Sequence, residues 1–139
     1  MTFDFSTVTP REPGADGLNG EFYTLAATGK IHLQRCSGCG HIQHPPRHRC
    51  RACLSEDLAW VRTDGMGTLY SWTTTYFAYD RGWAPAVPYC TGVVELPEGV
   101  RLIAAMGMGI EPRLDMPVQV VTAPTGEGHV LLSIITRST

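Results

Sequence analysis

The chain has 139 residues, of which 43% are hydrophobic and 17% are charged. This balance fits a folded protein with one compact domain or two small modules, and it excludes an intrinsically disordered chain. The apolar runs are far shorter than the ~20 residues of a membrane-spanning helix. The opening stretch MTFDFSTVTPREPG lacks the charged and then apolar pattern of a secretion signal. We therefore expect a cytoplasmic protein without a membrane segment.

The formal net charge is −2, which disfavours a dedicated nucleic-acid-binding protein. The charges are unevenly distributed, because no Asp or Glu lies between Phe22 and Ser55. The same stretch holds Lys30, Arg35, Arg47, Arg49 and Arg51. A local basic face of this kind suits a phosphate-bearing small molecule or an acidic partner surface. Equally well, the arginines can offset the thiolate charges of a metal site.

Four segments are predicted along the chain. Residues 1–18 form an N-terminal arm, either disordered or laid across a partner. Residues 19–30 form a short helical segment that Asn19 caps and Gly29 ends. Residues 31–62 form a cysteine-rich module, and residues 63–139 are rich in strand-forming residues. The predicted fold class is therefore mainly β, with one short helix near the N-terminus.

The last segment contains five predicted strands. They are TLYSWTTTYF, YCTGVVEL, VRLIAAMGM, MPVQVVT and HVLLSIIT, and the turn PEG joins the second to the third. Residues 78–88 interrupt them with a Pro- and Gly-bearing loop of irregular pattern. Five antiparallel strands with these loop lengths suit a small closed barrel, of which the OB-fold is a leading option.

The cysteine module carries two Cys-x-x-Cys pairs, Cys36 with Cys39 and Cys50 with Cys53, separated by ten residues. Each pair can direct two sulfurs at one ion, and two pairs complete a tetrahedral shell. Gly40 allows the tight turn after the second ligand. A shell closed by four thiolates leaves no position for water or substrate, so we expect a structural zinc ion. An iron-loaded site that transfers electrons is a weaker alternative.

Several stretches together resemble the DUF35 family. They are FYTLAATGKIHLQRCSGCGHIQHPPRHRCRAC, GMGTLYSWTTTY, VPYCTGVVELPEGVRL and MPVQVV, which span about residues 20–136. The resemblance implies an N-terminal helical segment, a rubredoxin-like zinc ribbon over 31–62 and a C-terminal five-stranded OB-fold barrel. The chain departs from the family pattern at Asp115, where members often have Gly, and at Arg51, where many have Pro.

The resemblance also implies a function. Family members are accessory subunits in acyl-CoA metabolism that assemble with thiolase-like enzymes, with steroid side-chain retro-aldolases or with hot-dog-fold enoyl-CoA hydratases. They are generally thought to carry no catalytic residues, and they help to shape a channel for the CoA thioester. We therefore expect a non-catalytic subunit of a thiolase-like or aldolase complex, which handles acyl-CoA substrates.

No catalytic set is evident in the sequence. Cys90 shares strand parity with apolar residues, so a buried thiol is the better interpretation, and the sequence pattern does not point to an acidic residue that would act with His129. The loop 78–88 presents Asp80, Arg81 and Trp83 at a position where OB-folds place binding contacts. These residues form a predicted partner- or CoA-binding tip, unless Trp83 folds back on the barrel. Arg47, Arg49 and Arg51 are the other predicted partner- or CoA-binding residues.

A second hypothesis is a single-stranded nucleic-acid-binding protein, because zinc ribbons and OB-folds both serve that role. Tyr70, Trp72 and Tyr76 would stack on bases, and Arg47, Arg49 and Arg51 would bind phosphates. The overall acidity and the single lysine argue against it.

Overall fold

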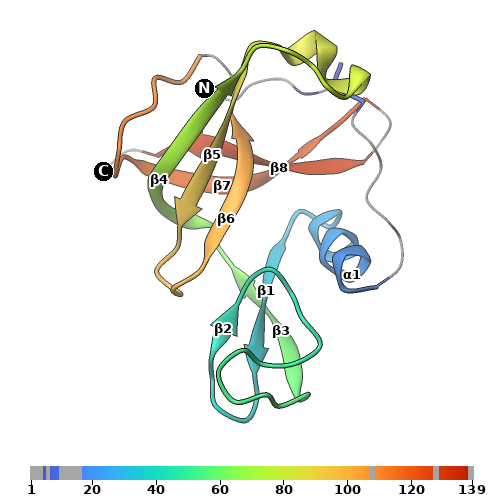
Figure 1. Cartoon of the computed structure of the whole chain (residues 1–139), viewed down its shortest axis with the longest axis vertical. Helices are drawn as coiled ribbons and strands as arrows, with labels where there is room; N and C mark the ends of the chain where they lie inside the picture. The colour runs from blue at the N-terminus through green and yellow to red at the C-terminus, as the bar shows by residue number, and fades with distance from the viewer. Residues whose placement is uncertain (1–4, 6, 10–16, 107–108, 127–128, 138–139) are drawn as a thin grey trace.

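The computed structural model describes residues 5, 7–9, 17–106, 109–126 and 129–137 (Figure 1). One helix and three short strands form its first half, and a 3₁₀ helix and five strands form its second. The elements are α1 (Gly17–Ala26), β1 (Ile31–Cys36), β2 (Ile42–Gln43), β3 (Leu58–Thr63), β4 (Met66–Thr75), η1 (Arg81–Ala86), β5 (Tyr89–Glu95), β6 (Arg101–Met106), β7 (Pro117–Pro124) and β8 (Val130–Thr136).

The first three strands form a small antiparallel sheet in the order β2-β1-β3. Gln34 of β1 lies opposite Gln43, and Ile31 lies opposite Thr63 on the other side. The two cysteine-bearing turns extend from the far end of this sheet, at the bottom of Figure 1. We call the sheet and its turns, residues 31–63, the ribbon.

The other five strands close into a barrel in the order β4-β5-β6-β8-β7. Neighbouring strands are antiparallel except β6 and β8, which run parallel and meet at Ala105 and Ser133. A closed five-stranded barrel of this kind is an OB-fold. The predicted fold class, mainly β with one short helix, a zinc ribbon region and an OB-fold barrel, is confirmed.

Alternation along β5 shows why this sequence forms a barrel. Cys90, Gly92, Val94 and Leu96 are all buried, as the predicted strand parity requires. Packing explains why residue 92 is a glycine, because a Cβ there would lie only 2.7 Å from Ile134 Cδ1 and 2.9 Å from Leu69 Cδ1 and Met106 Cε. Larger side chains from three other strands therefore fill the barrel at this point.

Two local expectations differ from the structure. The helix begins at Gly17, so Asn19 lies inside its first turn instead of capping it. Gly29 does end the segment, with φ +87° in the left-handed region. The loop expected to be irregular contains η1, because the Asp80 side chain accepts a hydrogen bond from Gly82 N–H at 2.9 Å and so starts the turn.

One apolar core runs through both halves of the molecule. Phe22 of α1 and Ile31 and Leu33 of β1 belong to the same buried cluster as barrel residues such as Leu102 and Ile134. This core crosses the expected boundary between residues 62 and 63. The ribbon and the barrel are therefore joined by packing as well as by the chain.

A second, smaller core lies beneath η1. The described part of the predicted arm contributes Phe5 and Val8, which are 1% and 0% exposed and pack with Ala86, Ala105 and Leu131. Backbone hydrogen bonds from Thr9 N–H to Gly82 and from Gly126 N–H to Val8 fix this segment. It thus lies on the chain's own barrel; most of the remainder of residues 1–18 is outside the described residues.

Figure 1 shows η1 and its flanking loops at the end of the barrel away from the ribbon. α1, the one α-helix within the described ranges, is too short to cross a membrane.

Candidate functional site

The four cysteines of the two Cys-x-x-Cys pairs converge at the end of the ribbon. Their Sγ atoms all lie within 4.8 Å of one another. The Sγ distance is 3.5 Å from Cys36 to Cys53 and 3.6 Å from Cys39 to Cys50. A tetrahedral Zn²⁺ with bonds of about 2.3 Å to sulfur requires sulfurs roughly 3.8 Å apart. The donor set and its spacing therefore fit a zinc ion.

The two cysteine turns repeat one backbone pattern. In the first, Cys36 N–H donates to His41 O at 2.9 Å and Gly40 N–H donates to Cys36 O at 2.8 Å. In the second, Cys50 N–H donates to Ser55 O and Leu54 N–H donates to Cys50 O, both at 2.9 Å. Gly40 and Leu54 occupy equivalent positions with φ +78° and +66°. The sequence pointed to Gly40, but a leucine gives no signal for a left-handed residue.

The thiols need a cation to ionise together. The pKa of Cys36 is lowered to about 6, mainly because the backbone N–H of Cys39 donates to its sulfur. The backbone N–H of Ser55 lowers the pKa of Cys53, but the sulfurs of Cys36 and Cys39 outweigh this effect and raise it to about 12. Four thiolates at this separation repel one another, so a bound metal is what allows all of them to lose their protons.

Two buried glutamines hold the chain between the cysteine turns. Gln34 Nε2 donates to Arg47 O at 2.9 Å, and Gln34 Oε1 accepts from Arg47 N–H at 2.8 Å and from Gln43 Nε2 at 2.9 Å. Gln43 Oε1 accepts from Arg51 N–H at 2.9 Å, and its Nε2 also donates to Arg49 O at 3.2 Å. They therefore fix the backbone of all three predicted binding arginines. Sequence reasoning missed these glutamines, although polar residues facing each other on paired strands were a usable signal.

The three arginines differ in their surroundings. Arg49 pairs with Glu56 at 3.0 Å, and both side chains are mostly exposed. This pair contributes little to stability in water. The side chains of Arg47 and Arg51 are exposed and form no ion pair with other residues in the described ranges. Of these three arginines, Arg47 and Arg51 are therefore the two available to a ligand or partner.

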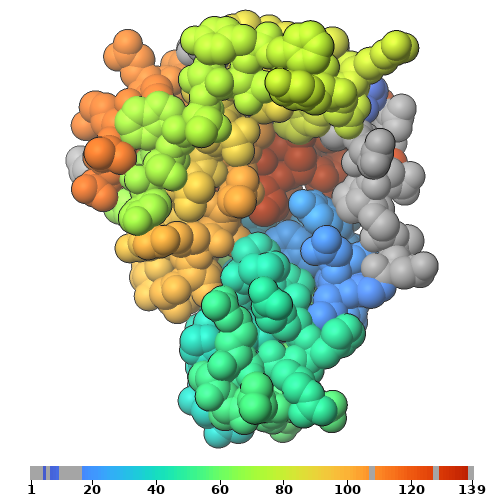
Figure 2. All heavy atoms as spheres, viewed as in Figure 1, coloured from blue at the N-terminus to red at the C-terminus, as the bar shows by residue number. Residues whose placement is uncertain are grey.

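The predicted tip 78–88 divides into structural and exposed parts. Trp83 folds back, since its ring stacks on Tyr89 at 4.7 Å and meets Phe5 edge-on at 6.1 Å. Asp80 begins η1, whereas Arg81 is exposed. Three exposed aromatic side chains precede Arg81 in the chain: Tyr76 is 76%, Phe77 65% and Tyr79 90% exposed. We call residues 76–79 the aromatic loop; this segment spreads over the end of the barrel opposite the ribbon (Figure 2).

The Cys90 thiol and two of the aromatic residues proposed to stack on bases already contact other residues of the chain. Cys90 is 3% exposed, and its sulfur lies 3.3 Å from Thr74 Oγ1, as expected for a buried thiol. The Arg101 guanidinium lies 3.8 Å from the centre of the Tyr70 ring and therefore covers one face of that ring. Trp72 packs partly against the main core. Of the three aromatic residues expected to stack on bases, Tyr76 is therefore the most accessible.

Comparison with known protein families assigns both halves of the chain. Residues 24–59 match the model described as ChsH2, rubredoxin-like zinc ribbon domain, and residues 60–123 match ChsH2, C-terminal OB-fold domain. The chain belongs to the DUF35 family. The resemblance drawn from the sequence is confirmed, and so is a zinc ribbon whose cysteines can bind the metal.

Two individual relatives of the chain are named as enzyme subunits. The chain is 31% identical over 109 residues to a probable enoyl-CoA hydratase alpha subunit of Thermomonospora curvata, covering 76% of this chain but 33% of that protein. It is 29% identical over 72 residues to the benzoylsuccinyl-CoA thiolase subunit BbsA of Thauera aromatica, covering 52% of this chain and 48% of that subunit. The match thus spans about a third of the length of the hydratase subunit and about half of the length of the thiolase subunit.

A solved structure gives a longer match. A chain of the Ltp2-ChsH2(DUF35) aldolase superposes with a TM-score of 0.76 at 29% identity. The match covers 88% of this chain and 97% of that chain. Homologues of the chain thus include a thiolase subunit and a chain of an aldolase complex.

The two departures from the family pattern have structural consequences. Asp115 has φ +62°, a conformation in which Gly is more easily accommodated. Arg51, exposed beside the second cysteine turn, adds a cation to the surface facing the barrel.

Proposed function

We propose that this protein is a non-catalytic subunit that binds a thiolase-like enzyme or an aldolase and supports its handling of acyl-CoA thioesters. The observation that carries the proposal is the match to the DUF35 chain of an aldolase, since it extends over 97% of that chain. The relative named as a benzoylsuccinyl-CoA thiolase subunit supports the thiolase alternative. The relative named as an enoyl-CoA hydratase alpha subunit makes a hydratase a further possible partner.

A non-catalytic role agrees with the chemistry of the described residues. Cys36, Cys39, Cys50 and Cys53 are the proposed zinc ligands, and four sulfurs fill a tetrahedral shell. When bound, the ion supplies a cross-link between the two cysteine turns and favours the folded ribbon. Cys90 is enclosed by the barrel and offers no accessible nucleophile. The contribution of this chain is then a rigid surface.

The aromatic loop with Arg81 is the proposed contact to the enzyme. Tyr and Arg are enriched among the residues that dominate binding energy in protein interfaces. Phe77 and Tyr79 contact each other edge-on at 4.9 Å, so together they present one apolar projection. Asp80 and Trp83 support this surface from inside, since Asp80 starts η1 and Trp83 anchors it to the barrel.

The test is affinity purification of the tagged chain from its native host, with mass spectrometry of the proteins that accompany it. We expect a thiolase-like or aldolase enzyme to co-purify in a fixed ratio. Tyr79→Ser should reduce its recovery at least about tenfold, because a central aromatic anchor is lost. Leu114→Ser is the matched control, since Leu114 is also exposed, at 65%, and lies outside the aromatic loop. Turnover of an acyl-CoA by the purified chain alone would contradict the proposal.

A further inference from the structure

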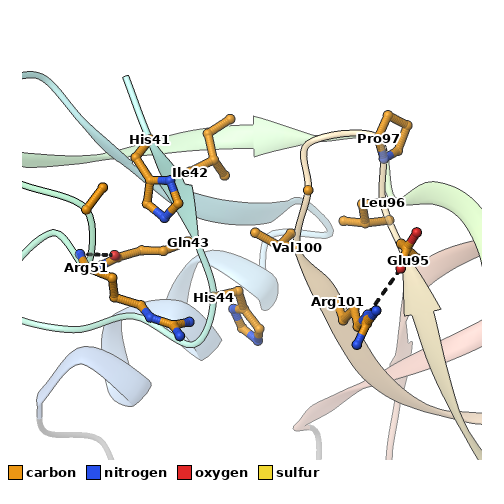
Figure 3. A pocket seen from close by; sticks show the side chains of 12 residues that line it. His41, Ile42, Gln43, His44, Arg51, Glu95, Leu96, Pro97, Val100 and Arg101 are labelled. Atoms are coloured by element: carbon orange, nitrogen blue, oxygen red, sulfur yellow. Dashed lines mark hydrogen bonds and ion pairs between the residues drawn. The ribbon is translucent and has the colours of Figure 1, made fainter. Parts of the chain in front are cut away.

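A cleft separates the ribbon from the β5–β6 hairpin of the barrel. Its volume is about 860 Å³, within the range of small-molecule sites. The ribbon side is formed by residues 41–44 and by Arg51 and Ala52, and the barrel side by residues 95–97 and 99–101. Figure 3 shows side chains from both sides directed into this space.

One end of the cleft gathers hydrogen-bond donors. In Figure 3 the Arg51 side chain extends toward His44, and Arg101 lies across the gap on β6. The Arg51 guanidinium has no ion-pair partner among the described residues. Burial lowers the pKa of His44, so its ring is neutral near pH 7 and can donate one hydrogen bond. Two guanidinium groups and an imidazole thus border one solvent-filled space.

The nearby carboxylates are already engaged. Among the described residues, Glu95 is the only acidic one lining the cleft, and its Oε2 accepts from Arg101 Nε at 3.1 Å. Glu98, at the hairpin turn, accepts from Thr63 Oγ1 at 2.7 Å and does not line the cleft. The donor end therefore has more positive than negative charge, and Arg51 has no ion-pair partner among the described residues.

The other end of the cleft is apolar. Ile42 lines it from the ribbon, and Leu96, Pro97 and Val100 line it from the hairpin; Figure 3 shows Leu96 and Val100 on the hairpin side of the gap. A cleft with cations at one end and aliphatic side chains at the other suits a ligand that joins phosphate groups to a flat apolar body. A nucleotide has this composition, and an inorganic anion would leave the apolar end unused.

The walls of the cleft are held in place by the rest of the fold. The backbone N–H of Arg51 donates to buried Gln43, and the Thr63–Glu98 hydrogen bond joins the hairpin turn to the end of β3. Ile42 and Val61 of the ribbon pack against the main core. Arg51 is therefore presented from an ordered backbone, which lowers the entropic cost of binding.

We propose that this cleft binds the phosphorylated nucleotide part of a small molecule, with its phosphates between Arg51 and Arg101 and its base against Ile42 and Val100. Guanidinium groups bind phosphate oxygens in pairs of parallel hydrogen bonds, which favours phosphate at the donor end. The identification of the ligand as the nucleotide end of an acyl-CoA rests on the proposed function; the cleft's preference for a phosphorylated nucleotide does not.

The test is calorimetric titration of the zinc-loaded full chain with adenosine 3′,5′-bisphosphate. Adenosine and inorganic pyrophosphate are the two comparison probes. We expect the bisphosphate to bind more tightly than either of them, because only it uses both ends of the cleft. Arg51→Gln should weaken its binding at least about tenfold. Glu95→Gln should tighten it several-fold, because the one lining carboxylate is removed and Arg101 is released.

Arg62→Gln is the matched control, since Arg62 is exposed on β3 and lies outside the cleft. Equal losses in Arg51→Gln and Arg62→Gln would mean non-specific attraction and would overturn the proposal. Pyrophosphate binding as tightly as the bisphosphate would also overturn it. Co-purification of the partner enzyme with the wild-type chain separates the two proposals. If wild type binds the bisphosphate but no enzyme co-purifies with it, the cleft keeps its assignment and the subunit role is refuted.

Discussion

Thr63 Oγ1 donates a 2.7 Å hydrogen bond to Glu98 Oε2, which joins the last residue of the ribbon to the β5–β6 turn 35 positions along the chain. Thr63 is only 5% exposed, and its Oγ1 also accepts from Gly65 N–H at 3.2 Å. The bond crosses the junction of the two modules where β3 leads into β4.

Removing this hydrogen bond should weaken the whole fold. Thr63→Val keeps the shape of the side chain but leaves Glu98 and Gly65 N–H without their partner, so the free energy of unfolding should fall by about 1–3 kcal/mol. Urea denaturation of the zinc-loaded protein measures this. Glu98→Gln retains an acceptor and should cost less. A Thr63→Val protein as stable as wild type would show that the bond contributes nothing.

Metal content tests the cysteine centre. We expect a single tightly bound zinc ion and a colourless protein, and Cys39→Ser should abolish stoichiometric zinc binding. Because ribbon residues share the main core, removing the metal should also increase amide hydrogen exchange in adjoining barrel strands. Elemental analysis and hydrogen-exchange mass spectrometry provide the measurements. A coloured protein with a reversible redox wave would instead indicate iron.

The two cysteine turns allow a paired test of backbone strain. Leu54 has φ +66°, so Leu54→Gly should raise the free energy of unfolding by about 1 kcal/mol. Gly40 has φ +78° in the equivalent position, and Gly40→Ala should lower it by a similar amount. Denaturation at a fixed free zinc concentration compares them. If both substitutions changed the free energy of unfolding in the same direction, the two positions would not share a left-handed conformation.

Acid should destabilise the protein partly through His44. Burial lowers the folded-state pKa of this ring below its unfolded value near 6.5, so the unfolded chain binds more protons. Stability should therefore fall as the pH drops from 7.5 through 6.5 towards the folded pKa. His44→Gln should show a smaller fall between pH 7.5 and 5.5. Thiolate protonation affects both proteins, so the difference between them isolates His44; identical pH profiles would reject this assignment.

Phe5 provides a test of the small core beneath η1. Phe5→Ala leaves a cavity at a site that is 1% exposed, and the free energy of unfolding should fall by about 3–5 kcal/mol. Because Phe5 contacts Trp83, limited proteolysis should then cleave within 81–86 more rapidly than in wild type. Thr7→Ala, at an exposed neighbouring position, should change neither measurement.

Local patterns explain which features the sequence could predict. The cysteine spacing and the alternation around Cys90 depend on neighbours in the chain, and both agree with the structure. The role of Trp83 depends on Phe5 and Tyr89, which no local pattern connects, so the choice between an exposed tip and a folded-back ring stayed open. The cleft joins Arg51 to Arg101 across two modules, and only the tertiary structure brings them to the same space.

The core that holds Phe22 and Leu33 together with Leu102 and Ile134 has a consequence for anyone who engineers such proteins. A ribbon transplanted from a relative would carry apolar residues that are complementary to a different barrel. Such chimaeras should therefore fold poorly unless the contacting residues of the ribbon and the barrel are exchanged together.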